Sequence, residues 1–208
     1  CAIFGDVGDQ TLHERLPKNP LNPYGETKLK VEHLLESHFQ SRGVQSAVLR
    51  YFNASGAEPQ GRVGEWHVPE THLIPRVFQE AIAGNPISVF GDQYPTPDGT
   101  CVRDYIHVTD LAEAHLAAMN KLLKLNSKQG IFLDYNLGSE KGYSVKEVIA
   151  EAAKVVGKSI ELKIEPPRAG DAVKLVADST KAKTELGFQP KFSLHEILKS
   201  AWAWEQKR

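Results

Sequence analysis

Apolar positions along the chain change repeatedly between helical and strand-like spacing. Between Tyr24 and Ser41 they recur every three or four residues, which is typical of a helix, and Gly43 ends the segment. The stretch from Gln45 to Phe52 is almost continuously apolar apart from Arg50, as in a strand that is buried on both faces of a parallel sheet. Helical and strand patterns then keep alternating, which predicts an α/β fold.

The rest of the pattern extends this alternation. Ser144 and Ser193 each stand three residues before a glutamate, which is the capping-box pattern at the start of a helix. The run from Cys1 to Phe4 has the pattern of the last half of a buried strand, followed by a turn at Gly5. We predict helices over 71–83, 109–123, 144–156 and from 193 onwards, and strands over 87–90, 104–108, 132–137 and 160–164.

The first residue is a cysteine inside that apolar run, not a methionine. A signal peptide would show a basic segment and a longer apolar core. We therefore interpret the sequence as a fragment whose upstream part is missing. A mild change of composition, with glycine, proline and charge concentrated over 56–70, suggests an internal boundary.

Composition excludes several classes of function. The 208 residues carry 25 Lys+Arg against 26 Asp+Glu, so there is no net positive field to attract nucleic acid. No apolar run approaches the roughly 18 residues of a membrane span. Cys1 and Cys101 are too few for a disulfide framework, which favours a reducing compartment and a cytoplasmic location.

Tyr24 and Lys28 are the first candidates for chemistry. Four residues apart on a predicted helix, they share one face, which brings the ammonium close to the phenol. A neighbouring cation favours the phenolate and makes a tyrosine usable as a general base. The alternative is an ordinary surface pair. The position after Asn22-Pro23, on a helix that leads into a buried strand, favours the catalytic interpretation.

Polar residues near the predicted strand ends form a second group of candidates. Asn53 follows a buried strand, at the edge of the sheet where open α/β folds bind ligands; alternatively, it caps a turn. Arg103 and Arg168 could together clamp a diphosphate, or each could form its own surface salt bridge. Asp104 either contributes to this site or neutralises a buried guanidinium.

Two expectations are negative. We interpret His107 as a packed or hydrogen-bonded histidine, and both cysteines are isolated, so we predict no metal site. The 208 residues also contain no Gly-x-Gly-x-x-Gly loop after a strand. Any dinucleotide site would therefore have its phosphate loop upstream of Cys1.

Six segments together resemble the extended short-chain dehydrogenase/reductase family, and within it the enzymes that epimerise UDP-hexoses. They follow one another in the family's order, and the resemblance covers essentially the whole chain. The segments are Asn22-Pro23-Tyr24-Gly25-Glu26-Thr27-Lys28, Leu49-Arg50-Tyr51-Phe52-Asn53 with Gly56-Ala57, His72-Leu73-Ile74-Pro75, the run from Asp98 to Val108, Tyr135-Asn136-Leu137-Gly138 and Arg168-Ala169-Gly170-Asp171.

The resemblance implies an NAD-dependent reaction on a UDP-hexose. Tyr24 would take the proton from the sugar 4-hydroxyl while NAD accepts the hydride, and Lys28 would hold the nicotinamide ribose. The keto sugar would turn about its phosphate linkage and be reduced on its opposite face. This implies interconversion of UDP-glucose and UDP-galactose, a step of galactose metabolism.

The same resemblance assigns further binding residues. Tyr51 and Phe52 match positions near the nicotinamide and the sugar, and Tyr24 and Lys28 also count as cofactor contacts. The substrate contacts that it implies are Asn53, His72, Leu73, Arg103, Arg168, Asp171 and Leu175.

Departures from the family pattern shape these expectations. The family's catalytic Ser or Thr would fall just before Cys1, so we expect these residues alone to be inactive. His72 stands where some members carry Asn. Leu175 stands where some relatives carry a bulky Tyr, so we expect the whole enzyme to tolerate N-acetylated UDP-sugars. The alternatives are a UDP-pentose 4-epimerase for xylose and arabinose, a sugar-nucleotide dehydratase, and a non-catalytic nucleotide-sugar binding module.

The resemblance also implies a division of the chain. Residues 1–56 would be the carboxyl-terminal part of an NAD-binding Rossmann domain. Residues 57–208 would form mainly a UDP-sugar-binding lobe, with strands and helices that return to the first domain. The whole protein would pair as a homodimer through a helix bundle that includes residues 24–41.

Overall fold

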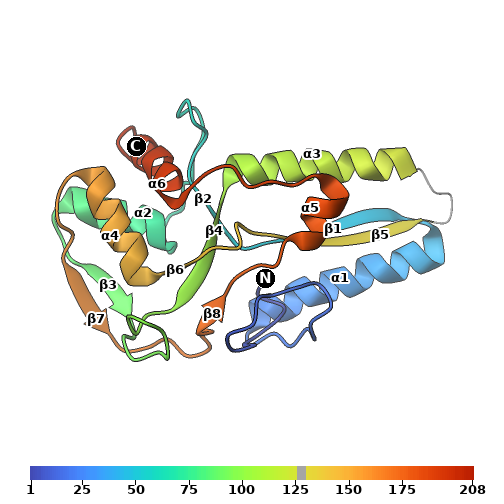
Figure 1. The fold of residues 1–208 in the computed structure, drawn as a ribbon, viewed down its shortest axis with the longest axis horizontal. Helices are drawn as coiled ribbons and strands as arrows, with labels where there is room; N and C mark the ends of the chain where they lie inside the picture. Colours follow the sequence, from blue (N-terminus) through green and yellow to red (C-terminus); the bar gives the residue numbers. More distant parts are fainter. Residues whose placement is uncertain (126–129) are drawn as a thin grey trace.

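A computed structural model describes residues 1–125 and 130–208 of the chain. At its centre β1 (Gln45–Tyr51) pairs in parallel with β5 (Ile131–Leu137), with Gln45 opposite Ile131 and Tyr51 opposite Leu137. Helices α1 (Pro23–Arg42) and α3 (Val108–Leu125) lie on opposite sides of this pair (Figure 1). The α/β class predicted from the alternating pattern is confirmed.

Local signals fix both ends of α1. The side chain of Asn22 accepts a hydrogen bond of 2.9 Å from the Gly25 N–H, and Pro23 occupies the first turn, where its missing N–H costs nothing. Gly43 ends the helix at φ +65°, in the left-handed region that favours glycine. The predicted start and end therefore agree with the structure to within a residue or so.

A second group of strands continues from the end of β1. The short strand β2 (Asn53–Ser55) pairs in parallel with β4 (Val102–His107), which also pairs with β6 (Gly142–Ser144) and β8 (Lys174–Leu175). The predicted strand at 104–108 thus exists but begins two residues earlier. The two-to-three-residue strands carry no periodicity of their own and were not predicted.

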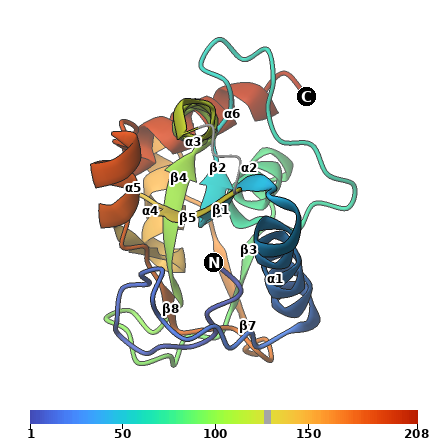
Figure 2. The same ribbon diagram turned by 90° about the vertical axis from the view of Figure 1, so that its right-hand side faces the viewer.

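The remaining elements form a lobe at one end of the molecule (Figures 1 and 2). Its core packs Phe78, Ile149 and Leu198 with their neighbours. One helix, α5 (Thr180–Leu186), lies outside this lobe, against α3 and β5, and was not predicted. The elements are α2 (Leu73–Ala83), β3 (Ile87–Phe90), α4 (Val145–Val156), β7 (Leu162–Glu165) and α6 (Leu194–Glu205) in the lobe, and α5 (Thr180–Leu186) outside it.

One strand prediction is wrong, and another is right about the strand but wrong about its burial. Ile3 and Phe4 are buried, as the apolar run suggests, but the backbone forms a turn in which the Phe4 N–H donates to the Cys1 carbonyl at 3.1 Å. In β7 the alternation predicts one buried face, yet Leu162 and Ile164 are 42% and 45% exposed. Ile164 instead lines a pocket described below.

A buried ion-pair network connects β1 with α1 and β5. Arg50, the charged residue within β1, forms two parallel hydrogen bonds of 2.8 Å with the Glu32 carboxylate of α1. Its Nη1 lies 2.9 Å from Asp134 of β5. A guanidinium in this position is tolerated because both partners are present.

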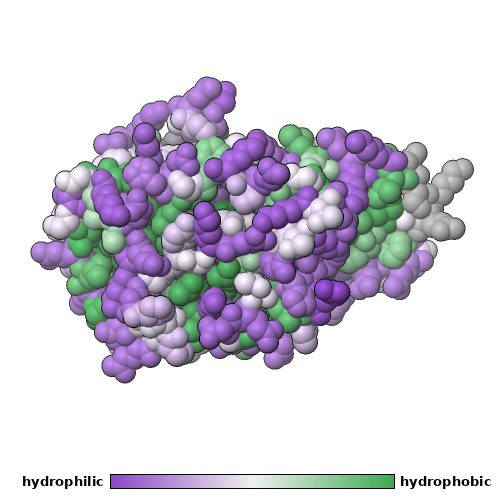
Figure 3. All heavy atoms as spheres, viewed as in Figure 1, coloured by the Kyte–Doolittle hydropathy of each residue, from purple (hydrophilic) through white to green (hydrophobic). Residues whose placement is uncertain are grey.

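The molecular surface is mixed. Polar residues cover most of the face shown in Figure 3, with apolar residues interspersed. Within residues 1–125 and 130–208, no helix combines the length and the hydropathy of a membrane span.

Candidate active site

The structure places Tyr24 and Lys28 on the first two turns of α1, on one face of the helix as predicted. The Lys28 Nζ lies 5.1 Å from the centre of the Tyr24 ring. Tyr24 is 64% exposed, and neither its hydroxyl nor the Lys28 ammonium has a hydrogen-bond or salt-bridge partner among the described residues. Both groups are therefore free to bind a ligand.

Tyr51, Phe52 and Asn53 follow one another where β1 passes into β2, and their side chains have different surroundings. Phe52 is buried with Phe4 in a small core cluster. Tyr51 is half-exposed, and its ring lies 6.2 Å from that of His115 on α3. Asn53 is partly exposed and lies opposite Tyr105 in the parallel register of β2 and β4.

Arg103, Asp171 and Leu175 come together at the start of β4. The parallel pairing of β4 with β8 sets Arg103 opposite Leu175. The Arg103 Nη2 lies 3.9 Å from Asp171, and its Nη1 donates to the Val102 carbonyl at 2.9 Å. Because these bonds occupy little of the guanidinium fork, Arg103 keeps donors for an anion.

Arg168 has no salt-bridge partner within residues 1–125 and 130–208, so the surface ion pair that was its alternative interpretation is absent there. Its guanidinium lies 3.7 Å from the centre of the Phe90 ring, which is a cation–π contact. Of the two arginines in the predicted clamp, only Arg103 has an acidic partner among the described residues, namely Asp171. A clamp by both guanidinium groups stays a prediction.

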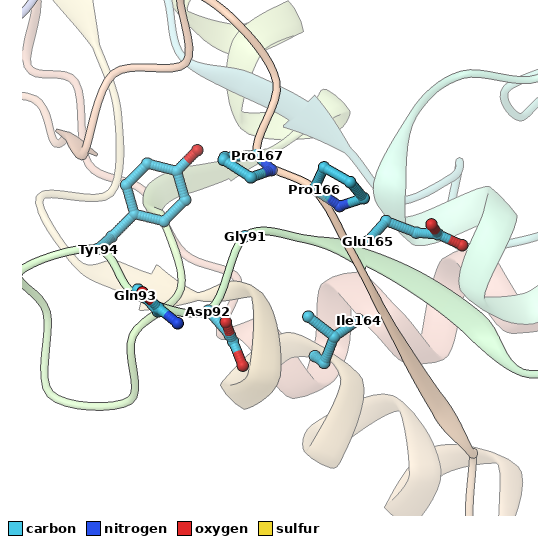
Figure 4. Close-up of a pocket in the computed structure, with 8 residues that line it drawn as sticks. All are labelled: Gly91, Asp92, Gln93, Tyr94, Ile164, Glu165, Pro166 and Pro167. Atoms are coloured by element: carbon cyan, nitrogen blue, oxygen red, sulfur yellow. The ribbon is translucent and has the colours of Figure 1, made fainter.

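A pocket of about 430 Å³ opens beside this loop, between the ends of β3 and β7 (Figure 4). Its volume is in the range of small-molecule sites. The sequence does not predict this pocket, since the only local signal is a glycine- and proline-rich stretch after each strand. The lining residues are Gly91, Asp92, Gln93, Tyr94, Ile164, Glu165, Pro166 and Pro167.

The two groups of candidates lie near each other in the fold. A Cβ built on Gly170, between Arg168 and Asp171, would lie 3.9 Å from the carbonyl oxygen of Leu21. Leu21 stands only three residues before Tyr24. No hydrogen bond or salt bridge among the described residues joins Tyr24 or Lys28 to the arginine groups.

His72 and Leu73 mark the start of α2. His72 is the residue before the first turn, and its imidazole is mostly exposed. Leu73 is partly buried against the core of the lobe. The contacts that these side chains make belong to the lobe, so their contact with substrate stays a prediction.

Asp104 does not neutralise Arg103, as one of the sequence-based alternatives proposed. Neighbouring residues of a strand point to opposite faces, and Asp104 points away from Arg103 into the protein. It accepts hydrogen bonds from the N–H groups of Ser139, Glu140 and Ala177 at 2.8–3.1 Å. Burial nevertheless raises the pKa of this carboxyl.

His107 is a packed, hydrogen-bonded histidine, as predicted. Its Nδ1 accepts from the Thr109 N–H at 3.0 Å, and its Nε2 lies 3.1 Å from the Ser200 hydroxyl. Its ring stacks on Phe192. Burial lowers the pKa of this imidazole, which agrees with an unprotonated Nδ1.

A parallel α/β sheet between helices, with polar side chains gathered beyond the ends of its strands, defines a Rossmann-type protein. A family model described as GDP-mannose 4,6 dehydratase matches residues 1–201, and the chain belongs to this family.

Individual relatives match the chain over nearly all of its length. UDP-glucose 4-epimerase of Halalkalibacterium halodurans is 47% identical over 209 residues, which cover 100% of this chain and 61% of the relative. The crystal structure of UDP-glucose 4-epimerase from Brucella ovis in complex with NAD matches with a TM-score of 0.90 at 42% identity, covering 98% of this chain and 62% of the other.

A third match is the crystal structure of UDP-glucose 4-epimerase from Bifidobacterium longum in complex with NAD+ and UDP. It has a TM-score of 0.90 at 36% identity, and it covers 99% of this chain and 61% of the other. The chain thus spans about three fifths of the length of the curated relatives it matches.

Proposed function

We propose that the whole protein is an NAD-dependent UDP-hexose 4-epimerase that interconverts UDP-glucose and UDP-galactose. The observation that carries the proposal is the pair of Tyr24 and Lys28, whose polar groups are free at the start of α1. The relatives named above carry the same activity in their names, which supports the assignment.

The donors on α1 fit the cofactor. An ammonium and a phenol that have no partner among the described residues are suited to the hydroxyl groups of a nicotinamide ribose. Lys28 and Tyr24 would hold this ribose, with Tyr51 and Phe52 nearby. NAD, when bound, supplies a reversible hydride acceptor for the C4–H of the sugar.

Tyr24 would act as the general base on the 4-hydroxyl. Its phenolate accepts the hydroxyl proton, and the ammonium of Lys28 compensates the negative charge. On the return step the phenol gives the proton back to the oxygen at C4. The side chain needs access to the sugar for this role, which agrees with its exposure.

The arginine groups would hold the other end of the substrate. Arg103 and Arg168 would bind the diphosphate, with Asp171 orienting Arg103. The neighbouring pocket has room for a nucleoside ring. Asn53, His72, Leu73 and Leu175 would contact the sugar. Anchoring the nucleotide in this way leaves the hexose free to present either face.

The central test is Tyr24→Phe in the full-length protein. Since general acid–base catalysis contributes about 10²–10⁴-fold, we expect kcat for UDP-galactose to fall by at least about 100-fold. Because Lys28 would still hold the ribose, most of the NAD, read by absorbance after denaturation, should stay bound. A variant that retains full activity would exclude Tyr24 as the base.

A UDP-pentose 4-epimerase is the nearest rival, because it would use the same base and the same diphosphate contacts. Relative turnover of UDP-galactose and UDP-arabinose by the full-length protein separates the two. A non-catalytic binding module would bind UDP and turn over neither sugar.

We also propose that the whole protein is a cytoplasmic enzyme and that it works as a homodimer through the exposed face of α1.

A further inference from the structure

Four side chains converge just before α2, and one of them is the His72 described above. Glu65, His67, Glu70 and His72 lie within eight residues, and each offers one ligand atom within 4.8 Å of all the others. The Nδ1 atoms of His67 and His72 both approach the same oxygen of Glu65, the former at 3.1 Å. His67 Nδ1 is also 3.7 Å from Glu70 Oε2.

The carboxylate of Glu70 independently indicates a cation-binding site. Its side chain is only 4% exposed. One oxygen accepts hydrogen bonds of 2.8 and 2.9 Å from the N–H groups of Thr71 and His72. The other oxygen is buried, lies 3.7 Å from the His67 Nδ1 and has no hydrogen-bond partner among the described residues. A buried carboxylate oxygen is costly in this state unless a cation satisfies it.

No lysine or arginine within the described residues supplies that cation. In the part of the chain that the structure describes, Glu65 pairs only with His67 and His72, and Glu70 pairs only with His67. The neighbouring Arg208 contacts the His67 carbonyl and the Trp66 ring instead. Two imidazoles that bind a metal through their nitrogen lone pairs are neutral ligands, so a divalent cation here would balance the charges of the two carboxylates.

The backbone that carries the cluster is anchored. The Trp204 indole of α6 donates to the Glu65 carbonyl at 2.8 Å, and Arg208 donates to the His67 carbonyl at 3.2 Å. His72 is the N-cap residue that directly precedes α2. The ligand atoms are therefore presented by segments that the rest of the lobe already holds in place.

We propose that Glu65, His67, Glu70 and His72 bind one divalent transition-metal ion, with Zn²⁺ as the best match. Imidazole nitrogen together with carboxylate oxygen suits Zn²⁺, whereas Mg²⁺ and Ca²⁺ prefer oxygen alone. Bonds of about 2.0–2.2 Å in a tetrahedron set the ligand atoms about 3.4 Å apart. The ligand atoms already lie within 4.8 Å of one another, and their separations would shorten to this value when the metal binds.

This site revises the expectation of no metal, which rested on the cysteines and on His107. The metal would have a structural role and would tie segment 65–70 to the start of α2. It would take Nδ1 of His72, so the Nε2 of the same ring stays available for the substrate contact proposed above. The metal site does not depend on the epimerase activity.

The test is Zn²⁺ binding by the tag-free, full-length protein, measured by calorimetry with ZnSO₄ alone. We expect one equivalent per chain and a higher melting temperature with the metal. His67→Ala and Glu70→Gln should each weaken binding at least tenfold. Gln keeps an oxygen acceptor for the Thr71 and His72 N–H groups, so this variant removes the charge with little change of the turn.

His195→Ala is the matched control, because His195 pairs with a single carboxylate, Glu151, at 2.8 Å on the surface. It should leave Zn²⁺ affinity unchanged. Circular dichroism checks that each variant is folded, and Co²⁺ absorbance provides a second readout through the intense bands of tetrahedral coordination. Stoichiometry near zero, or equal affinity in the wild type, His67→Ala and Glu70→Gln, would overturn the proposal.

Discussion

At the scale of single residues, His107 links three parts of the fold. It is fully buried, and the Ser200 hydroxyl that it contacts also accepts from the Ala57 N–H at 3.1 Å. Its Nδ1 is occupied as an acceptor, so protonation would break the bond from Thr109. The neutral imidazole is thus part of the native hydrogen-bond network.

This arrangement predicts a pH dependence of stability. The folded-state pKa of His107 is lowered by burial, so in the window just below the unfolded value of about 6.5 the unfolded chain binds more protons. The free energy of unfolding should therefore fall as pH drops through this window. Urea unfolding between pH 7.5 and 5.5 measures the effect.

His107→Asn should flatten this contribution, since the amide offers an acceptor to Thr109 and does not titrate. Replacing the exposed His33 by Asn is the control and should leave the pH profile unchanged. An identical profile in wild type and His107→Asn would contradict the prediction.

Leu175 bears on the choice of substrate. It is partly buried and lies opposite Arg103, so a larger side chain here would narrow the space beside the proposed diphosphate contact. We expect Leu175→Tyr to reduce kcat/KM for UDP-N-acetylglucosamine by at least about tenfold, with little effect on UDP-galactose. Kinetics on both substrates with the full-length protein measure the ratio, and failure of the wild type itself on the acetylated substrate would refute the hypothesis.

At the scale of elements, two capping boxes offer a matched comparison. Ser144 and Ser193 each accept from the N–H of the glutamate three residues on, at 3.0 and 3.3 Å. Ser193 is exposed, whereas the buried Ser144 also bonds Asp98 in the loop before β4. The first serves its helix alone, and the second also joins a helix to a loop.

Ser193→Ala should therefore lower the free energy of unfolding by about 1 kcal/mol, the usual value of an N-cap. Ser144→Ala should cost more, because the Asp98 carboxylate loses a buried donor. Chemical denaturation of both variants gives the two values. A larger effect at Ser193 than at Ser144 would show that the contact with Asp98 adds nothing.

At the scale of the whole molecule, the two long helices carry apolar side chains on the surface. On α1 Val31 and Leu34 are 52% and 57% exposed and are one helical turn apart. On α3 Leu116, Met119 and Leu123 are also exposed. An exposed apolar stripe is typical of a contact surface, and the proposed dimer uses the one on α1.

Leu34→Glu should shift the full-length protein from dimer towards monomer, because a charge in an apolar interface must be desolvated. Light scattering during size-exclusion chromatography measures the mass. Leu123→Glu on α3 is the control and should leave the dimer intact. A dimer that resists Leu34→Glu and dissociates with Leu123→Glu would place the interface on α3.

The sequence by itself determined the features whose signals lie within a few residues. The bounds of α1 follow from Asn22, Pro23 and Gly43, and the four-residue spacing of Tyr24 and Lys28 places them on one face. A helix closes its bonds locally, so its caps and periodicity are legible without the rest of the chain.

Only the tertiary structure decided what depends on distant segments. Arg50 interrupts an apolar strand, and its burial requires Glu32 and Asp134 from two other elements. The short strands exist because β4 provides their hydrogen bonds, and the pocket forms because β3 and β7 end side by side. The burial of the unpartnered Glu70 oxygen likewise depends on distant residues, because the Trp204 indole of α6 holds segment 65–70 through the Glu65 carbonyl. Such features arise from contacts between backbone groups and charges that are far apart in the sequence. The pattern of residues along the chain does not show which of these distant groups come close in space.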